Sequence, residues 1–328
     1  MDHWLSTVFV DLVTPFHHGA IDGAALASLV RWQASRGMRG FVVNGAVGEY
    51  ATLSGEERRA VVAIVRANTG RFAHLLLSAG SNDTAATVSE IEQADRMGID
   101  GILLRMPYYS RPTQAGLVAH AREAAAASPL PIVLDDDPDR CGVTLSGSSL
   151  EALTSCETIV GVLDRRGDAR RCETLGRSMP DRYLHLTGRI DSLAAYRLCG
   201  GSGAVSSAAG LFPGLCMRMA EALRQHDYPT AQLLQRRTYP LLALLGEQPS
   251  LAQLKLAYAL QRPGALSVEC REISENFDAV RTAQLHEALT ALPKEGGTVF
   301  HAATAPTREA DPQLFRQAER QAALQARI

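Results

Sequence analysis

The stretch Ile159-Val-Gly-Val-Leu-Asp-Arg-Arg-Gly-Asp168 is an apolar run that ends abruptly in charged residues. A continuous apolar run of this length is typical of a parallel β-strand that is buried on both faces. Similar runs recur along the chain and alternate with longer amphipathic segments, so we predict a series of buried strands. The predicted strands are Thr7–Val13, Gly40–Asn44, His74–Ala79, Gly101–Arg105, Pro131–Asp135, Ile159–Leu163, Tyr183–Thr187 and Ala204–Ser206.

The segments between the predicted strands have the pattern of surface helices. In Asp22–Gly37 the apolar residues recur with a period close to 3.6, and Ser54 with Glu57 forms a capping box that starts the next helix. Alternating strand–helix units over about 220 residues predict an α/β fold, a (β/α)8 TIM barrel. The main alternative is an open doubly wound sheet, but no GxGxxG motif follows the first strand.

Three regions are expected along the chain. Residues 1–226 form the barrel. Residues 227–293 form a C-terminal helical extension packed on the barrel, with helices over Asp227–Gly246, Leu251–Gln261 and Phe277–Leu292. Residues 294–328 form a polar tail, either a single exposed helix or a partly disordered segment.

Composition and charge exclude several classes of function. The 328 residues have a net charge of −2 without a long run of one sign, so a nucleic-acid-binding face is not indicated. No uncharged stretch of about 18 apolar residues predicts a membrane span. The N-terminus lacks a signal-peptide pattern, and the six cysteines are scattered without CxxC spacing, which indicates a cytoplasmic protein with reduced thiols. Neither a metal site nor a cofactor is expected.

Short motifs accompany six of the predicted strands. They are Leu12-Val-Thr-Pro-Phe16, Gly45-Ala-Val-Gly-Glu-Tyr-Ala-Thr-Leu-Ser54, Gly80-Ser-Asn-Asp-Thr84, Pro107-Tyr-Tyr-Ser-Arg-Pro-Thr113, Pro138-Asp-Arg-Cys-Gly142 and Gly203-Ala-Val-Ser-Ser207. With these motifs in this order, the chain resembles the dihydrodipicolinate synthase / N-acetylneuraminate lyase family over about residues 5 to 292. Such a resemblance is strong evidence for the fold and weaker evidence for the activity, because function depends on the site.

The resemblance implies class I aldolase-type chemistry. In that family a lysine on the sixth strand forms a Schiff base with pyruvate or another 2-oxo acid. A tyrosine on the fifth strand moves protons with the help of a threonine in the loop after the second strand. A second tyrosine, after the fourth strand, reaches the site from the neighbouring subunit, so the resemblance also implies a homo-oligomer, a dimer or a tetramer.

The positions that match these groups hold other residues. Leu163 stands at the position of the lysine, and Asp135 stands at that of the proton-moving tyrosine. Ala46 and Val47 stand at two threonines, although the backbone N–H groups of this loop can still hold an anion. Imine formation requires an unprotonated amine. A shifted alignment does not supply one, because no lysine precedes Lys255.

Asp135 has two interpretations. It lies in Leu134-Asp-Asp-Asp-Pro138, where neighbouring carboxyls raise one another's pKa or attract a cation, so Asp135 is a candidate general base or cation ligand. Alternatively it is the ion-pair partner of a nearby arginine, with Arg105 or Arg189 as the expected partner.

Other positions of the family pattern are retained. Tyr109 matches the relay tyrosine, Arg140 matches the arginine that binds the second substrate's carboxylate, and Gly188 matches a glycine that lines the pocket. For Tyr109 and Arg140 a structural role is an equally good interpretation, since such residues also pack at interfaces. The full set of candidate binding residues is Ala46, Val47, Tyr109, Asp135, Arg140, Leu163, Gly188 and Arg189.

The residues leave three hypotheses open. The first is a non-catalytic homologue that binds a small carboxylate or serves as a partner or regulatory subunit. The second is a lyase or hydratase that acts on a 2-oxo acid or another carboxylate through a site rebuilt from Asp135, Tyr109, Arg140, Arg105 and Arg189. The third is retained lyase activity, which is disfavoured because loss of a catalytic nucleophile typically costs on the order of 10⁶-fold in rate.

Overall fold

Parallel strands close into a barrel in the order β1-β10-β9-β8-β7-β6-β5-β4. The computed structural model describes residues 3–70, 72–247, 249–262, 264–272 and 277–293. The predicted TIM barrel is therefore confirmed, and the open sheet is not formed. The barrel strands are β1 (Val8–Asp11), β4 (Gly40–Val43), β5 (His74–Ala79), β6 (Gly101–Arg105), β7 (Ile132–Asp136), β8 (Ile159–Asp164), β9 (Leu184–Thr187) and β10 (Gly203–Ser206).

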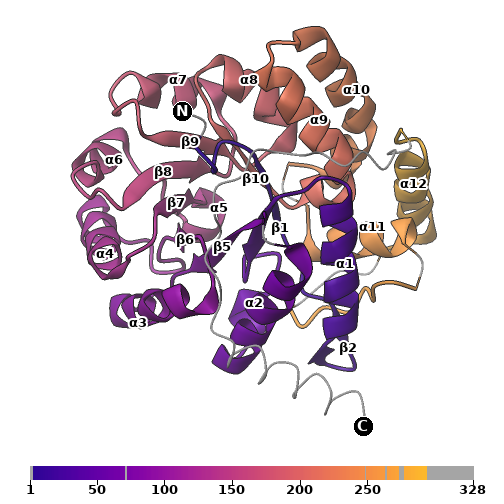
Figure 1. Cartoon of the computed structure of the whole chain (residues 1–328), viewed down its shortest axis with the longest axis horizontal. Helices are drawn as coiled ribbons and strands as arrows, with labels where there is room; N and C mark the ends of the chain where they lie inside the picture. The colour runs from indigo at the N-terminus through magenta and orange to yellow at the C-terminus, as the bar shows by residue number, and fades with distance from the viewer. Residues whose placement is uncertain (1–2, 71, 248, 263, 273–276, 294–328) are drawn as a thin grey trace.

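Helices surround the strands as a ring (Figure 1). A small antiparallel pair, β2 (Phe16–His17) with β3 (Ala20–Ile21), lies outside the barrel sheet. The helices that follow the barrel strands are α1 (Gly23–Ser35), α2 (Gly55–Thr69), α3 (Thr84–Ala94), α4 (Gln114–Ala127), α5 (Pro138–Cys141), α6 (Gly147–Leu153), α7 (Ala169–Gly176), α8 (Leu193–Leu198) and α9 (Pro213–Arg224). Short 3₁₀ turns η1 (Tyr50–Thr52), η2 (Asp95–Met97), η3 (Ile190–Ser192) and η4 (Ala208–Leu211) complete this part.

Local sequence explains where the helices start and stop. At the start of α2 the Ser54 hydroxyl accepts from the Glu57 N–H at 3.1 Å, and the Glu57 carboxylate accepts from the Ser54 N–H at 2.9 Å. This is the predicted capping box, and it satisfies two donors that the helix leaves unpaired. After the helix, Gly70 adopts a φ of 74°, a left-handed conformation that glycine adopts without steric cost.

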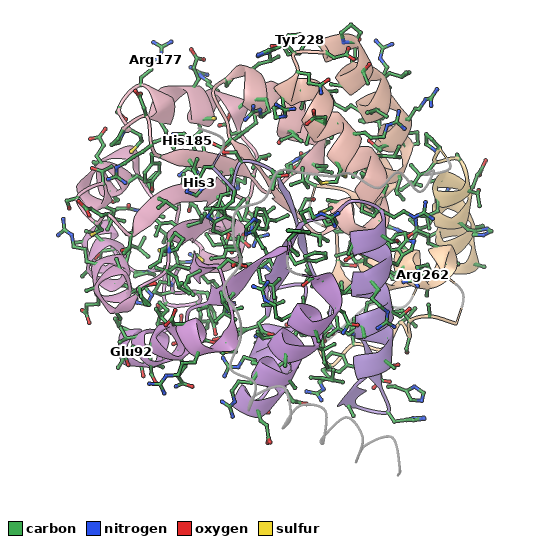
Figure 2. All side chains as sticks on the ribbon, in the orientation of Figure 1. His3, Glu92, Arg177, His185, Tyr228 and Arg262 are labelled. Atoms are coloured by element: carbon green, nitrogen blue, oxygen red, sulfur yellow. The ribbon has the colours of Figure 1, made fainter. Side chains whose placement is uncertain are left out.

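Two apolar layers hold the barrel together, and Figure 2 shows side chains between the strands and the surrounding helices. The larger one fills the space between the strands and the surrounding helices. The smaller one fills the barrel interior with inward-pointing side chains such as Phe9, Leu103 and Leu163. Because side chains alternate along a strand, one strand contributes to both layers. A continuous apolar run in the sequence is the consequence of this double burial.

Three further helices follow the barrel, namely α10 (Tyr228–Leu245), α11 (Leu251–Gln261) and α12 (Ala279–Thr290). Helix α10 packs against α9, α11 contacts η4, and α12 packs against both α10 and α11. The prediction for residues 294–328 lies outside the described residues. Within the described part of the chain, no helix is both long enough and apolar enough to cross a membrane.

Gly161 of β8 provides a test of strand packing. A Cβ atom at this position would lie 2.4 Å from the carbonyl oxygen of Leu184 on β9. We expect Gly161→Ala to lower the free energy of unfolding by about 1–3 kcal/mol, because two hydrogen-bonded strands have to separate. Gly176→Ala is the control, since no atom lies within 4 Å of its Cβ position. Urea unfolding followed by circular dichroism measures both, and equal midpoints for the two variants would contradict the predicted β8–β9 contact.

Candidate functional site

The carboxyl ends of the barrel strands carry inward-pointing charged residues. Phe9 of β1 and Val133 of β7 belong to the apolar cluster inside the barrel. Asp11 and Asp135 lie two residues further along the same strands, so they point to the same side and form the next layer towards the barrel mouth. Leu163 belongs to the interior cluster and has no exposed surface. The mouth at this end is where active sites of TIM barrels lie.

Arg165, the residue after β8, fills this mouth. Its Nε donates to Oδ1 of Asp135 at 2.7 Å, and one terminal nitrogen donates to Oδ2 of the same carboxylate at 2.8 Å. The other terminal nitrogen donates to Oδ2 of Asp11 at 3.1 Å. The side chains of Arg165, Asp135 and Asp11 are 14%, 5% and 1% exposed. Two carboxylates therefore hold one guanidinium through the planar, bidentate geometry that arginine favours. We call these three residues the mouth cluster.

Burial and charge act against each other in the mouth cluster. Burial raises the pKa of Asp11, and the positive charge of Arg165 partly offsets this rise. For Arg165 burial alone would lower the pKa, but the charge and hydrogen bonds of Asp135, together with Asp11, raise it above its ordinary value. Arg165 therefore stays cationic at all accessible pH values. One oxygen of Asp11, Oδ1, is buried and has no hydrogen-bond partner.

Two glycines make room for the cluster. A Cβ atom on Gly45 would lie 2.1 Å from Oδ1 of Asp11, so only glycine allows the loop after β4 to approach this carboxylate. A Cβ atom on Gly188 would lie 2.6 Å from the Cα atom of Arg165. Gly188, a predicted pocket residue, thus lies against the backbone that carries Arg165.

The loop that contains Ala46 and Val47 is held by its backbone and by Glu49. The Thr14 hydroxyl donates to the carbonyl oxygen of Gly48 at 2.7 Å. Glu49, fully buried, accepts from Lys255 Nζ at 2.6 Å and from the N–H groups of residues 271 and 272. Ala46 and Val47 add no polar side chain, and Val47 is 9% exposed and packs in the outer apolar layer. The loop is therefore an anchored structural element next to the mouth.

Tyr109 and Arg140 lie at the periphery of the mouth. Tyr109 is 91% exposed and has a φ of 69°, which is uncommon for a residue with a side chain. Arg140 forms an ion pair with Asp137 at 3.3 Å, and its side chain is 50% exposed. In the described chain neither residue contacts Asp135 through a hydrogen bond or an ion pair, so these predicted site residues do not converge on it.

The prediction that Arg105 or Arg189 is the ion-pair partner of Asp135 is wrong. Arg105 donates to the Ser78 hydroxyl at 2.9 Å and to the Gly80 carbonyl at 3.1 Å, and it lies over the Tyr50 ring. Arg189 pairs with Asp191 and Glu247, both at 2.6 Å. Both arginines thus have partners of their own. Asp135 pairs with Arg165, because β7 and β8 are adjacent and bring Asp135 level with Leu163.

Sequence reasoning missed Arg165 and Asp11 as members of the site. The available signal was strand alternation: Arg165 follows Leu163 by two residues, so it shares the inward face of that strand. A buried aspartate at the equivalent end of β1 was a second signal, since Asp11 has no other cation in hydrogen-bonding contact within the described residues. The closure of the barrel that brings β1 near β8 is visible only in three dimensions.

A second group of charged residues lies next to the mouth cluster, on the outward-facing side of β7 and β8. Arg171 donates to Oδ2 of Asp136 at 2.5 Å, and Asp164 accepts from the N–H groups of Arg166 and Asp168, each at 3.0 Å. Both aspartates point away from the barrel interior and fix the turn that carries Arg165. Burial raises the pKa of Asp136 from 3.8 to about 6, against the opposing charge of Arg171. Among the described residues no group of three or more metal-binding side chains is found.

Comparison with known proteins identifies the family. Residues 4–292 match the "Dihydrodipicolinate synthetase family". The 4-hydroxy-tetrahydrodipicolinate synthase of Methylobacterium radiotolerans is 36% identical over 260 residues, which cover 79% of this chain and 86% of that protein. The chain belongs to the dihydrodipicolinate synthetase family. The resemblance derived from the motifs is thereby confirmed.

Solved structures of this family have the same fold as this chain. Dihydrodipicolinate synthase from Aquifex aeolicus matches with a TM-score of 0.82 and 25% identity, over 86% of this chain and 96% of that one. The chloride-inhibited enzyme from Acinetobacter baumannii, crystallised with pyruvate, also matches with a TM-score of 0.82, at 26% identity, over 87% and 97% of the two chains. The present family member is therefore similar to a lyase of the aldolase type over nearly the whole length of those proteins.

Because of the mouth cluster, we expect substitution of Arg165 to destabilise the protein far more than substitution of its neighbour Arg166. Arg165→Met leaves two buried carboxylates without their cation, so we expect the free energy of unfolding to fall by about 3–5 kcal/mol. Arg166→Met removes an ion pair with Asp139 whose side chains are 57% and 42% exposed, so we expect a much smaller loss of stability, because solvent screens this pair. Urea unfolding of both variants provides the test, and losses of the same size would exclude a stabilising mouth cluster.

Asp136 predicts a pH dependence of stability. Its folded-state pKa of about 6 exceeds the ordinary 3.8, so the folded protein holds this proton more tightly than the unfolded chain. As the pH falls from about 7 to about 4, the wild type should therefore gain stability relative to Asp136→Asn, on the order of 2 kcal/mol. Asp139→Asn, which changes an exposed carboxyl, is the control and should show no such gain. Unfolding free energies at both pH values decide the matter, and parallel pH profiles for wild type and Asp136→Asn would contradict it.

Proposed function

We propose that this chain is a non-catalytic member of the dihydrodipicolinate synthetase family that has lost Schiff-base chemistry with pyruvate. The observation that carries the proposal is the mouth cluster. Arg165 occupies the barrel mouth directly above Leu163, and its guanidinium is bound by Asp135 and Asp11. A 2-oxo acid that entered this position would have to displace side chains that stabilise each other in a buried environment.

The distribution of lysine supports the proposal. The sequence contains Lys255 and Lys294 only, and Lys294 lies outside the described residues. Lys255 lies on α11, outside the barrel interior, and has no exposed surface. Its ammonium group donates to Glu49 and to the carbonyl oxygen of Glu269, each at 2.6 Å. A buried ammonium that is paired with a carboxylate is a poor nucleophile, because imine formation needs the free amine.

The arrangement of Asp135 argues against a rebuilt lyase or hydratase site. Both of its carboxylate oxygens accept hydrogen bonds from Arg165, and these charge-assisted bonds favour the ionised, engaged carboxylate. A general base has to reach the proton that it abstracts. Arg189, which a rebuilt site would use to bind the substrate, is held by Asp191 and Glu247. The non-catalytic role is therefore the better interpretation.

We further propose that the barrel acts as a partner subunit in a homo-oligomer. The loop of Tyr109 supports this part of the proposal, because a tyrosine that is 91% exposed with a left-handed backbone is well placed for contact with another chain. A small carboxylate ligand, if one binds at the mouth, would compete with Asp135 or Asp11 for Arg165. The proposed loss of imine formation does not depend on whether such a ligand binds.

Borohydride trapping tests the proposal directly. We incubate the protein with pyruvate, reduce it with borohydride and measure the intact mass. The expected result is an unchanged mass, because among the described residues no lysine faces the barrel interior to form the imine that borohydride reduces. The Acinetobacter baumannii synthase, which binds pyruvate according to its crystal structure, serves as the positive control.

Peptide mapping makes the result interpretable. An adduct of one reduced pyruvate on a barrel peptide would overturn the proposal. An adduct that disappears in Lys255→Met would show instead that this lysine has taken over the imine chemistry, which also overturns the proposal. The rate of pyruvate consumption in the presence of the protein should likewise equal the uncatalysed rate. Removal of a catalytic nucleophile lowers the catalysed rate on the order of 10⁶-fold.

A further inference from the structure

Two cysteines lie close together where α7 contacts α8, outside the barrel sheet. Cys172 is on α7, and Cys199 is the residue that follows the end of α8. Figure 1 shows the two helices side by side in the outer ring. The Sγ atom of Cys172 donates to the carbonyl oxygen of Cys199 at 3.6 Å. The Cys172 thiol therefore points at the backbone of the other cysteine.

This contact places the two cysteines within reach of a disulfide bond. A carbonyl oxygen is separated from its own Cα atom by bonds of about 1.2 and 1.5 Å, so Sγ of Cys172 lies at most roughly 6.4 Å from Cα of Cys199. Disulfides join cysteines whose Cα atoms are about 4.4–6.8 Å apart. Closure of the bond therefore requires a local rearrangement that turns the Cys199 side chain toward Cys172.

The chain after Cys199 permits such a rearrangement. Cys199 lies beyond the last residue of α8 and is followed by Gly200 and Gly201. Gly200 has a φ of 89°, in the left-handed region that glycine adopts without steric cost. No heavy atom lies within 4 Å of its Cβ position, so the backbone at Gly200 faces open space on that side.

The two thiols differ in their access to solvent. Cys172 has no exposed surface, whereas Cys199 is partly exposed. Burial, and after it the negative charges of ionised Cys199 and of Asp164, raise the pKa of the Cys172 thiol to about 12. The effect of Cys199 is a second sign that the two sulfur atoms are near each other, because Coulomb interactions weaken with distance. A dissolved oxidant therefore reaches Cys199 first, and Cys172 is the thiol that reacts second.

We propose that Cys172 and Cys199 form an intramolecular disulfide when the protein meets a peroxide. The Cys199 sulfur attacks one peroxide oxygen, the O–O bond breaks, and Cys199 becomes a sulfenic acid while one water leaves. The Cys172 sulfur then attacks the Cys199 sulfur and the S–O bond breaks. The leaving hydroxide takes the Cys172 proton and departs as a second water. The two thiols together lose two electrons, and one peroxide is reduced to two waters.

The bond links two helices that the reduced protein holds only by packing and hydrogen bonds. The chain between the two cysteines includes β9 and Gly188, which lies against the backbone of Arg165. A disulfide stabilises a protein mainly by constraining its unfolded state. The oxidised protein should therefore resist unfolding more than the reduced protein does. This site does not depend on the proposed loss of Schiff-base chemistry.

Oxidation of the full chain with hydrogen peroxide tests the proposal. Alkylation of the remaining thiols in denaturant, followed by intact mass measurement, counts them, and we expect two of the six thiols to be lost. Dithiothreitol should restore both. Trypsin cleaves after arginine, so the expected product joins peptide 172–177 to peptide 198–218. Fragmentation of this product distinguishes Cys199 from Cys216, which the second peptide also contains.

Two serine variants make the result specific. Oxidation should raise the urea midpoint of the wild type and leave that of Cys199→Ser unchanged, because this variant cannot form the bond. Cys156→Ser removes another partly exposed thiol and is the matched control, which should still form the bond. Since Cys199 is partly exposed, its variant keeps the test valid should Cys172→Ser fail to fold.

Four results would overturn the proposal. Every thiol could survive the peroxide, or oxidation could yield sulfinic and sulfonic acids without a disulfide. The bond could join two chains or another pair of cysteines. Finally, Cys199→Ser could lose the same number of thiols as the wild type.

Discussion

The hydrogen-bonded pairing of Arg165 with Asp135 and Asp11 is the interaction on which the candidate site depends. Burial removes the water that solvates the guanidinium, and hydrogen bonds from the guanidinium to well-placed carboxylates offset this cost. The buried carboxylates are stabilised by the same hydrogen bonds. Three strand ends, those of β1, β7 and β8, are thereby fixed to one another. The approach of Gly45 and Gly188 to the cluster, and the second cluster behind Asp136, follow from the need to enclose these charges.

The mouth cluster also fits the proposed loss of Schiff-base chemistry in a barrel that keeps the family fold. The barrel strands and the anchored loop around Glu49 provide rigidity whatever the mouth contains, because they are held by their own apolar layers and by the buried Lys255–Glu49 pair. Function in such folds depends on a few residues at the strand ends. In this chain those residues are bound to one another through Arg165.

Much of the fold was predictable from the sequence, because the signals are local. The predicted strands His74–Ala79 and Gly101–Arg105 and the helix Leu251–Gln261 agree with the structure at both ends. The predicted strand Thr7–Val13 was too long, since β1 ends at Asp11 where the chain leaves the barrel ladder. An apolar run in the sequence indicates that a strand is buried. It does not indicate at which residue the hydrogen bonds to the adjacent strands end.

The sequence by itself determined the strand–helix alternation, the family, and the identity of the residues at positions 46, 47, 135 and 163, since each depends on local pattern or on motif order. Only the tertiary structure decided which charges meet. Asp11 and Arg165 are separated by 154 positions and come together because the barrel closes between β1 and β8 through β9 and β10. Ion-pair partners depend on distances of a few ångströms, and such distances between remote segments are set by closure of the sheet.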